Sequence, residues 1–334
     1  MPLATTAWRP STERLDSDYE DLLGLWSDLE STLSVLLSRP QQVRDFASKI
    51  RQCDRWLQDL VAQDIDAALY VMFQLASTST VGYSASHALV CGTLCHILAR
   101  ELGLTPHERD CLVRAAFTMN IGMTALQDEL ASQRDRPSSS QQDAIDHHPE
   151  RSQEMLESLS ITDDLWLDVV GKHHHRLPER EPLKQLAPED RLNRILGTID
   201  RYAAMISPRK SRAGRSATDS VRAIVGQDVE HSDEVSFTLV RTIGLCPPGT
   251  FVRLDNGETA VVLRRGEKAN FPLVASLLDP QGEHRAQPGL HQTATGKPRI
   301  QSALARSAVT VELDHRTMVR LGLYAAQRSH TIER

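Results

Sequence analysis

Apolar residues in the first 63 positions recur at alternating steps of four and three. One series runs through Leu15, Tyr19, Leu22, Trp26, Leu29, Leu33 and Leu36, and a second, after SRPQQ, through Val43, Phe46, Ile50, Cys53, Leu57 and Leu60. This spacing keeps one apolar face on a helix, so the sequence predicts two amphipathic helices in residues 1–63. Two interpretations stay open: a hairpin that packs on its own chain, or a coiled-coil seam that joins two subunits in a homodimer. Each run barely reaches the three or four heptads of a convincing coiled coil.

Residues 64–244 continue with three-four apolar spacing behind polar starts, in segments such as ITDDLWLDVVGKHHH and PEDRLNRILGTIDRYAAMI. The joint LGLTPHERD has the residues that end one helix and begin the next. Gly103 closes the first helix, while Thr105 caps the second and forms a capping box with Glu108. Pro106 suits the first helical position. Long helices with short joints predict a helical bundle, and the whole chain is expected to be mainly α.

The pattern changes in residues 245–334. FVRLDNGETAVVL contains two runs rich in β-branched residues around Asp255-Asn256-Gly257, which is a strong hairpin signal. FPLVASLLDPQGE adds a further strand and turn, whereas GEHRAQPGLHQTATGKPRIQ is expected to be a loop. The residues after Leu313 are expected to form a short helix or a tail. These features predict a small β-rich C-terminal appendage.

Composition excludes several classes of protein. With 334 residues, 40% hydrophobic and 25% charged, the chain is typical of a globular protein, and its net charge of −6 argues against a dedicated nucleic-acid binder. No apolar run approaches the ~18 residues of a membrane span, and the N-terminal residues lack the apolar segment of a secretory signal. Five scattered cysteines indicate reduced thiols in a cytoplasmic protein, and Cys91 and Cys95, one helical turn apart, are interpreted as packing residues.

Histidines mark the chemistry of the predicted bundle. His87, the pair His147-His148, the run His173-His174-His175 and Asp200 fall on different helices. Facing helices of a bundle can direct ligands to a metal in its core, and imidazole with carboxylate suits zinc, iron, manganese or nickel. The alternative is that these residues are hydrogen-bonded core or surface groups, and the histidine run suits an exposed helix end.

The order of several segments resembles the bacterial HD-GYP family. These segments are YSASHALV, AAFTMNIGM, IDHHPERSQEML, VVGKHHHRLPER, RILGTIDRYAAMISPRKSR and LVRTIGLCPPGTFVRLDNGETAVV. The family is a branch of the HD-domain metal-dependent phosphohydrolases, whose helical bundles hydrolyse cyclic di-GMP at a centre of two or three metals. The resemblance implies an HD-domain-like bundle over residues 64–244, with cyclic di-GMP as the expected ligand.

Matched by position, the resemblance assigns roles to seven residues. The expected metal ligands are His87, His148, His173, His174 and Asp200. The expected phosphate-binding pair is Arg209 and Arg212, although SPRKSRAGR is also typical of a solvated basic loop.

The departures from the family fall on its catalytic positions. Met119 and Asn120 stand where the His-Asp pair should be, Met123 replaces a lysine, and Tyr83 replaces a glutamate that some members use. The loop HRLPEREPL contains none of the glycines of the DGxGYP stretch. A two-metal centre needs a carboxylate that bridges its ions, and neutral Asn120 is a poorer ligand for a hard cation.

Three functions follow as hypotheses. The first is a catalytically degenerate signalling or interaction protein that retains one divalent ion, or only the packing role of these residues. The second is an active phosphohydrolase with one metal on His148, His173 and His174, because three protein ligands and an open position form the catalytic zinc pattern. The third is a non-hydrolysing cyclic di-GMP sensor that uses Arg209 and Arg212.

Overall fold

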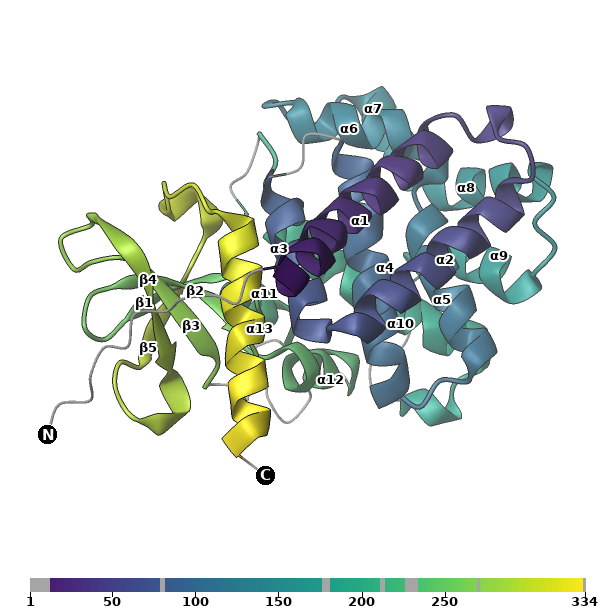
Figure 1. Ribbon diagram of the computed structural model, residues 1–334. Helices are drawn as coiled ribbons and strands as arrows, with labels where there is room; N and C mark the ends of the chain where they lie inside the picture. Colours follow the sequence, from purple (N-terminus) through teal and green to yellow (C-terminus); the bar gives the residue numbers. More distant parts are fainter. Residues whose placement is uncertain are drawn as a thin grey trace, which may run out of the picture.

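The computed structural model describes residues 13–78, 82–175, 181–210, 214–225, 234–268 and 271–332. A helical bundle occupies one side of the molecule and a small β-sheet the other, with the C-terminal helix at their junction (Figure 1). The mainly α fold with a C-terminal sheet that the sequence predicts is therefore confirmed.

The two N-terminal helices form as predicted: α1 (Glu13–Ser38) and α2 (Phe46–Gln63). Their seams, from Leu22 in α1 and from Phe46 in α2, are buried within the chain, where α1 contacts α2 and α4 and α2 contacts α5. Packing on the same chain therefore occupies these seams. The homodimer remains a prediction, and it would have to use outward residues such as Val35, which is 63% exposed.

The middle of the chain forms the rest of the bundle. Its helices are α3 (Ile65–Thr78), α4 (Tyr83–Glu101), α5 (Pro106–Thr118), α6 (Thr124–Ser132), α7 (Ser139–Asp146), α8 (His148–Ser158), α9 (Asp164–Lys172), α10 (Pro188–Ile206), α11 (Ala217–Val225) and α12 (Glu234–Ile243). α4 ends and α5 begins as the sequence predicts. Gly103 has a φ of 68° just after α4, and Thr105 forms a capping box with Glu108 at the start of α5.

Five strands of the described residues form an antiparallel sheet in the order β4-β3-β2-β1-β5. They are β1 (Phe251–Leu254), β2 (Thr259–Arg264), β3 (Leu273–Leu278), β4 (His284–Gln292) and β5 (Ile300–Leu304). The predicted hairpin joins β1 and β2, and Gly257 in its turn has a φ of 87° that glycine adopts without strain. Alternate residues face opposite sides, so Val261 joins the bundle core while Val262 joins a small second core.

The expectation of a loop over GEHRAQPGLHQTATGKPRIQ was wrong. These residues include β4, and β5 begins within them. The two strands lie at the edges of the sheet, where most of their side chains are exposed or half-buried, so they lack the apolar alternation that reveals a strand. Pro288 falls in β4, and proline is tolerated in an edge strand.

The segment after Leu313 forms a helix, α13 (His315–Ile332), which packs against α1, α3 and β2. Ion pairs also join the sheet to the bundle. Arg264 Nη1 in β2 lies 2.7 Å from Asp64 Oδ2. Nε of the neighbouring Arg265 lies 2.6 Å from Oδ1 of Asp66 in α3. The sheet and the bundle are therefore joined by apolar packing and by partly buried charge pairs.

Candidate metal centre

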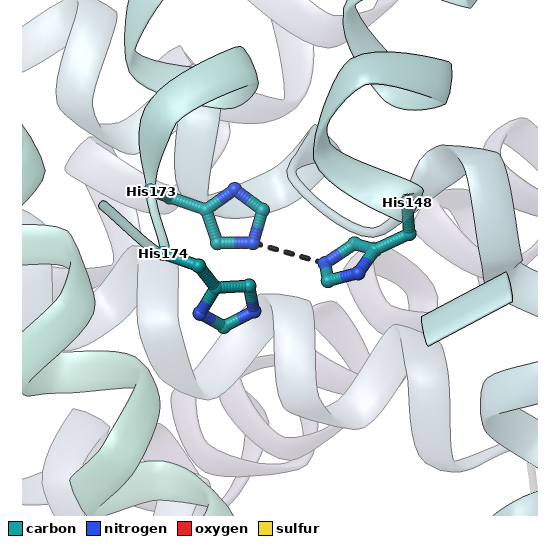
Figure 2. Close-up of side chains that lie close together, drawn as sticks. All are labelled: His148, His173 and His174. Atoms are coloured by element: carbon teal, nitrogen blue, oxygen red, sulfur yellow. Dashed lines mark hydrogen bonds between the residues drawn. The ribbon is translucent and has the colours of Figure 1, made fainter. Parts of the chain in front are cut away.

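His148, His173 and His174 lie together between the start of α8 and the end of α9 (Figure 2). His148 is the first residue of α8, and Pro149 next to it suits that position because the first amides of a helix have no partner to lose. His173 caps the end of α9. His148 and His173 are 0% and 2% exposed, whereas His174 is exposed. One ligand atom from each ring lies within 4.8 Å of the others.

A glycine permits the close approach that positions His173. A Cβ added at Gly197 in α10 would lie 3.2 Å from the His173 carbonyl oxygen, which is tighter than most contacts of real Cβ atoms. On the other side, the amide of Gly122 donates to the Ser152 hydroxyl at 3.0 Å and holds the turn after α5 against α8. Small residues thus let the backbone of α10, and of this turn, come close to α9 and α8.

Backbone contacts fix the tautomers of the two buried histidines. His148 Nδ1 lies 2.5 Å from the Ile145 carbonyl oxygen and His173 Nδ1 lies 2.7 Å from that of Val170. A carbonyl only accepts, so each Nδ1 carries the hydrogen and each neutral ring has a bare Nε2. The two Nε2 atoms lie 3.0 Å apart. Two bare nitrogens repel at this distance, so the contact needs a proton or a metal ion between them.

Burial argues against the proton. Burial lowers the pKa of His148. It lowers the pKa of His173 to about 3, with further lowering by the charges of His174 and His148. Both rings are then neutral near pH 7. Nitrogen ligands about 2.0–2.1 Å from a tetrahedral zinc would lie about 3.3 Å from each other, close to the observed spacing. The donor set therefore fits a divalent ion.

His87 and Asp200 form a second, adjacent group. His87 Nε2 in α4 lies 2.8 Å from Asp200 Oδ1 in α10, and Cys91 Sγ, one turn along α4, lies 3.6 Å from the same nitrogen. Burial raises the pKa of Asp200, but the hydrogen bond from His87 and the charges of His87, His173 and His174 outweigh it, so the pKa is lowered. The charge of Asp200 in turn acts on the pKa of His148 and of His173, so the two groups neighbour each other.

Tyr83 and Arg209 cover the second group. The Tyr83 ring stacks on His87 with centroids 5.6 Å apart, and Arg209 Nη2 donates to the Tyr83 hydroxyl at 2.9 Å. The Arg209 guanidinium also lies 4.7 Å from the centre of the Tyr83 ring. Arg209 is therefore beside the candidate centre, whereas Arg212 lies outside the described residues.

The five predicted ligands thus fall into two neighbouring groups, and the degenerate positions lie at the end of α5. Met119 is 1% exposed and belongs to the apolar core, and Asn120 and Met123 are half-buried in the turn that follows. Trp166 of α9 donates to Thr118 at 2.9 Å and holds this end of α5 against α9.

Sequence reasoning missed two features. Cys91, interpreted as a packing residue, lies against His87 and Asp200. A third group joins His107 and Cys111 of α5 to Asp163, the N-cap of α9. The His–Cys spacing of four residues on one helix is the signal that was available in both cases. In the third group, burial and then the charge of Asp163 raise the pKa of Cys111, so a neutral thiol donates to the capping carboxylate at 3.4 Å.

The fold is a helical bundle that brings three candidate metal ligands together from the start of α8 and the end of α9. A family model described as HD domain matches residues 68–234, half of the 334-residue chain. The chain belongs to the HD domain family, and its expected membership of the HD-GYP branch is confirmed. No helix among the described residues is long and apolar enough to cross a bilayer.

The chain is similar to a curated bacterial protein and to a solved structure. The cyclic di-GMP phosphodiesterase PA4108 of Pseudomonas aeruginosa is 28% identical over an alignment of 189 residues, which covers 55% of this chain and 45% of the relative. The chain thus spans about half the length of this relative. The solved structure of Bd1817, described as an HDG"Y"P protein from Bdellovibrio bacteriovorus, has a TM-score of 0.49 and 15% identity over 69% of this chain and 72% of that chain.

Proposed function

We propose that this chain is a metal-binding signalling protein of the HD-GYP type that holds a divalent ion on His148, His173 and His174 and hydrolyses cyclic di-GMP slowly or not at all. The observation that carries the proposal is the buried pair of Nε2 atoms 3.0 Å apart, each on a ring whose Nδ1 donates to a backbone carbonyl. This arrangement orients two lone pairs toward one point, as the outer hydrogen bonds of metal-ligating histidines do.

The protein groups supply position and charge. The carbonyls of Ile145 and Val170 hold the rings of His148 and His173, while exposed His174 can turn toward the same ion. A bound divalent ion would act as a Lewis acid on a phosphate oxygen. Arg209, next to the centre, supplies a fixed positive charge for a second phosphate oxygen.

The replaced residues are the reason to expect little hydrolysis. In-line displacement at two metals needs ions ~3.5–4 Å apart that stabilise both the attacking and the leaving oxygen. Asn120 carries no charge with which to bridge two ions, and Met119 is buried in the apolar core. Met123 offers no cation near a phosphate. A bound cyclic dinucleotide would then be held without rapid cleavage.

The expected ligand and the cellular compartment are further parts of the same proposal. The name of the similar Pseudomonas protein makes cyclic di-GMP the first ligand to test. All five cysteines are free and buried, which suits the reducing cytoplasm in which we propose that the protein acts.

Metal analysis with a hydrolysis assay tests the function. We expect purified protein to contain a divalent ion, His173→Ala to lose one ion per chain, and neither protein to hydrolyse cyclic di-GMP above a metal-free control. His147→Ala is the matched control, because His147 precedes His148 but is exposed and pairs with Asp143. It should keep the ion. Equal metal contents in all three proteins would contradict the binding site, and turnover that His173→Ala abolishes would show that the chain is an active phosphohydrolase.

The contacts of Arg209 favour the sensor alternative enough to test it. If its guanidinium holds a phosphate, calorimetry should detect cyclic di-GMP binding that weakens as salt rises, because ions screen exposed charges. Arg209→Ala should weaken this binding, whereas Arg136→Ala, an exposed change on another loop, should not. Absence of heat with the unmodified protein would exclude cyclic di-GMP as the ligand.

A further inference from the structure

Cys91 occupies a position where a thiolate could serve the metal centre. His87 and Cys91 are one helical turn apart on α4, so their side chains share a face, and Asp200 approaches that face from α10. His87 is 2% exposed, Cys91 is 0% exposed, and the Asp200 side chain is 17% exposed. One ligand atom of each lies within 4.8 Å of the others.

The distances suit a small thiophilic cation. Sulfur about 2.3 Å and nitrogen about 2.0–2.1 Å from a tetrahedral zinc are separated by roughly 3.5 Å, and Cys91 Sγ lies 3.6 Å from His87 Nε2. The His87–Asp200 contact of 2.8 Å is the length of a hydrogen bond and would widen around an ion.

We propose that Cys91 is a metal ligand that, with His87 and Asp200, holds a thiophilic divalent cation in the half of the centre that lacks the His-Asp pair of the family. The inference rests on the proposed function, because it assigns a ligand set to the same centre. The sulfur–metal bond forms as the thiol releases its proton to solvent. The Cys91 thiolate and the Asp200 carboxylate then balance the two positive charges of the ion.

The ligand set determines which metal this half selects. Thiolate prefers zinc and other soft or borderline ions, whereas carboxylate-rich centres suit magnesium and manganese. A thiolate in the half that lacks the bridging carboxylate of the family would therefore change the metal preference of the centre. A zinc ion held in this way would still lack a carboxylate shared with a second ion, so the inference agrees with slow or absent hydrolysis.

The chain supplies matched controls. Cys95 lies one turn beyond Cys91 on α4 and is equally buried, at 0% exposed, yet it is outside the groups that could hold a metal among the described residues. Cys111 belongs to the separate group on α5 and α9, so it is the competing source of a thiolate ligand. Substituting each cysteine by serine separates a metal ligand from a buried thiol.

Cobalt(II) is the probe, because a thiolate bound to cobalt gives a sulfur-to-metal charge-transfer band that nitrogen and oxygen ligands do not give. Full-length protein stripped of metal is titrated with cobalt(II). We expect the band in the unmodified protein, in Cys95→Ser and in Cys111→Ser, and its loss in Cys91→Ser. Cys91→Ala, which buries no hydroxyl, should also lack the band while keeping the far-ultraviolet circular dichroism of the unmodified protein.

Zinc competition measures the same ligand by affinity. Changes outside the ligand shell lower metal affinity roughly 10–100-fold, so loss of the Cys91 sulfur should lower zinc affinity by about 100-fold or more. A band that persists in both Cys91 variants, a band that Cys111→Ser removes, or no band in the unmodified protein would overturn the inference.

His173→Ala separates the two proposals. It should retain the thiolate band and lose the ion of the three histidines. If the unmodified protein gives no band but His173→Ala still loses an ion, the inference about Cys91 fails and the proposed function stands. If the band is present and His173→Ala loses no ion, the proposed histidine site fails instead.

Discussion

At the residue scale, the buried histidines His148 and His173 are oriented by the same kind of hydrogen bond. In both His148 and His173, Nδ1 donates to the carbonyl three residues earlier in the chain, which directs Nε2 into the bundle. The end of a helix makes this possible, because carbonyls in its last turn have no amide partner. Each ring is thus oriented by its own segment before any metal binds.

Restoring the lost pair tests whether the end of α5 still follows the path of the family. We expect Met119→His with Asn120→Asp to increase bound manganese or iron, because ligands of suitable charge would return near His87 and Asp200. We expect little hydrolysis of cyclic di-GMP, since turnover also needs a cation near the phosphate and a loop shaped for the substrate, and a site loose by ~1 Å usually fails. Metal analysis and product chromatography measure both results.

Either of two outcomes would contradict this expectation. Substantial turnover by the double variant would show that Met123 and the loop after His175 matter less than we infer. No gain in bound metal would show that Met119 and Asn120 do not stand in ligand positions. Met155→His is a control for a histidine added to the outer part of the bundle, and it should leave metal content unchanged.

At the scale of elements, a buried ion pair joins the N-terminal helices to the bundle. Asp54 of α2 is 0% exposed and lies 2.9 Å from Arg114 Nε of α5. Burial raises the pKa of Asp54, while Gln58 and Arg114 oppose the shift. Asp110 contacts the same guanidinium at 3.1 Å but is 26% exposed.

We expect Asp54→Ala to lower the free energy of unfolding by about 3 kcal/mol, because it leaves a mostly buried guanidinium without its closest partner. Asp110→Ala, the control on the exposed side of Arg114, should cost about 1 kcal/mol or less. Urea unfolding followed by circular dichroism measures both. Equal losses of unfolding free energy in the two variants would mean that the burial of Asp54 does not determine how much its carboxylate contributes to stability.

The docking of α13 should depend on pH. Burial lowers the pKa of His315, the charge of Arg306 lowers it further, and Asp314 opposes both. The Tyr70 hydroxyl lies 3.3 Å from its Nδ1. Because the folded-state pKa is below the ordinary value near 6.5, the unfolded chain takes up the proton first. The contribution of neutral His315 to folding stability is therefore present above about pH 6.5 and is lost as the pH falls below this value.

The expected result is a stability difference between the unmodified protein and His315→Gln that narrows from about pH 7 to about pH 5. Glutamine retains a polar side chain but does not titrate. Urea unfolding at each pH gives the difference, and His147→Gln, at an exposed position, should show none of this narrowing. Parallel stability curves for the unmodified protein and His315→Gln would contradict the assignment.

At the scale of the whole molecule, one apolar core runs from α1 to α13. Leu33 of α1, Leu57 of α2, Leu94 of α4 and Val319 of α13 all belong to it, and each is at most 4% exposed. The sheet contributes Phe251 and the alternate residues of β2. A division at residue 63 or 244 would therefore cut through shared packing.

We expect a chain that begins at residue 64 to be insoluble or to lose helical structure, because removal of α1 and α2 uncovers the apolar faces of α4 and α5. Solubility, circular dichroism and light scattering of the truncated and full-length proteins provide the test. A soluble fragment with cooperative unfolding would instead show that the predicted boundary at residue 63 separates independently folding units.

The sequence by itself determined what depends on neighbouring residues. Three-four spacing predicted α1 and α2, the capping box of Thr105 and Glu108 predicted the start of α5, and Asp255-Asn256-Gly257 predicted the β1–β2 turn. Local chemistry decides these features, because caps and turns satisfy backbone groups a few residues away. The order of histidine-containing segments likewise predicted the family, since each segment is short and carries its own residues.

Only the tertiary structure decided which distant residues meet. His87 and Asp200 are 113 positions apart, and their contact depends on how α4 packs on α10. The same packing places Cys91 beside them, although the sequence was interpreted as giving Cys91 only a packing role. Strands β4 and β5 form because their neighbours in the sheet supply hydrogen-bond partners that a polar edge sequence does not reveal. Contacts of this kind depend on the shape of the whole core, and no local pattern encodes them.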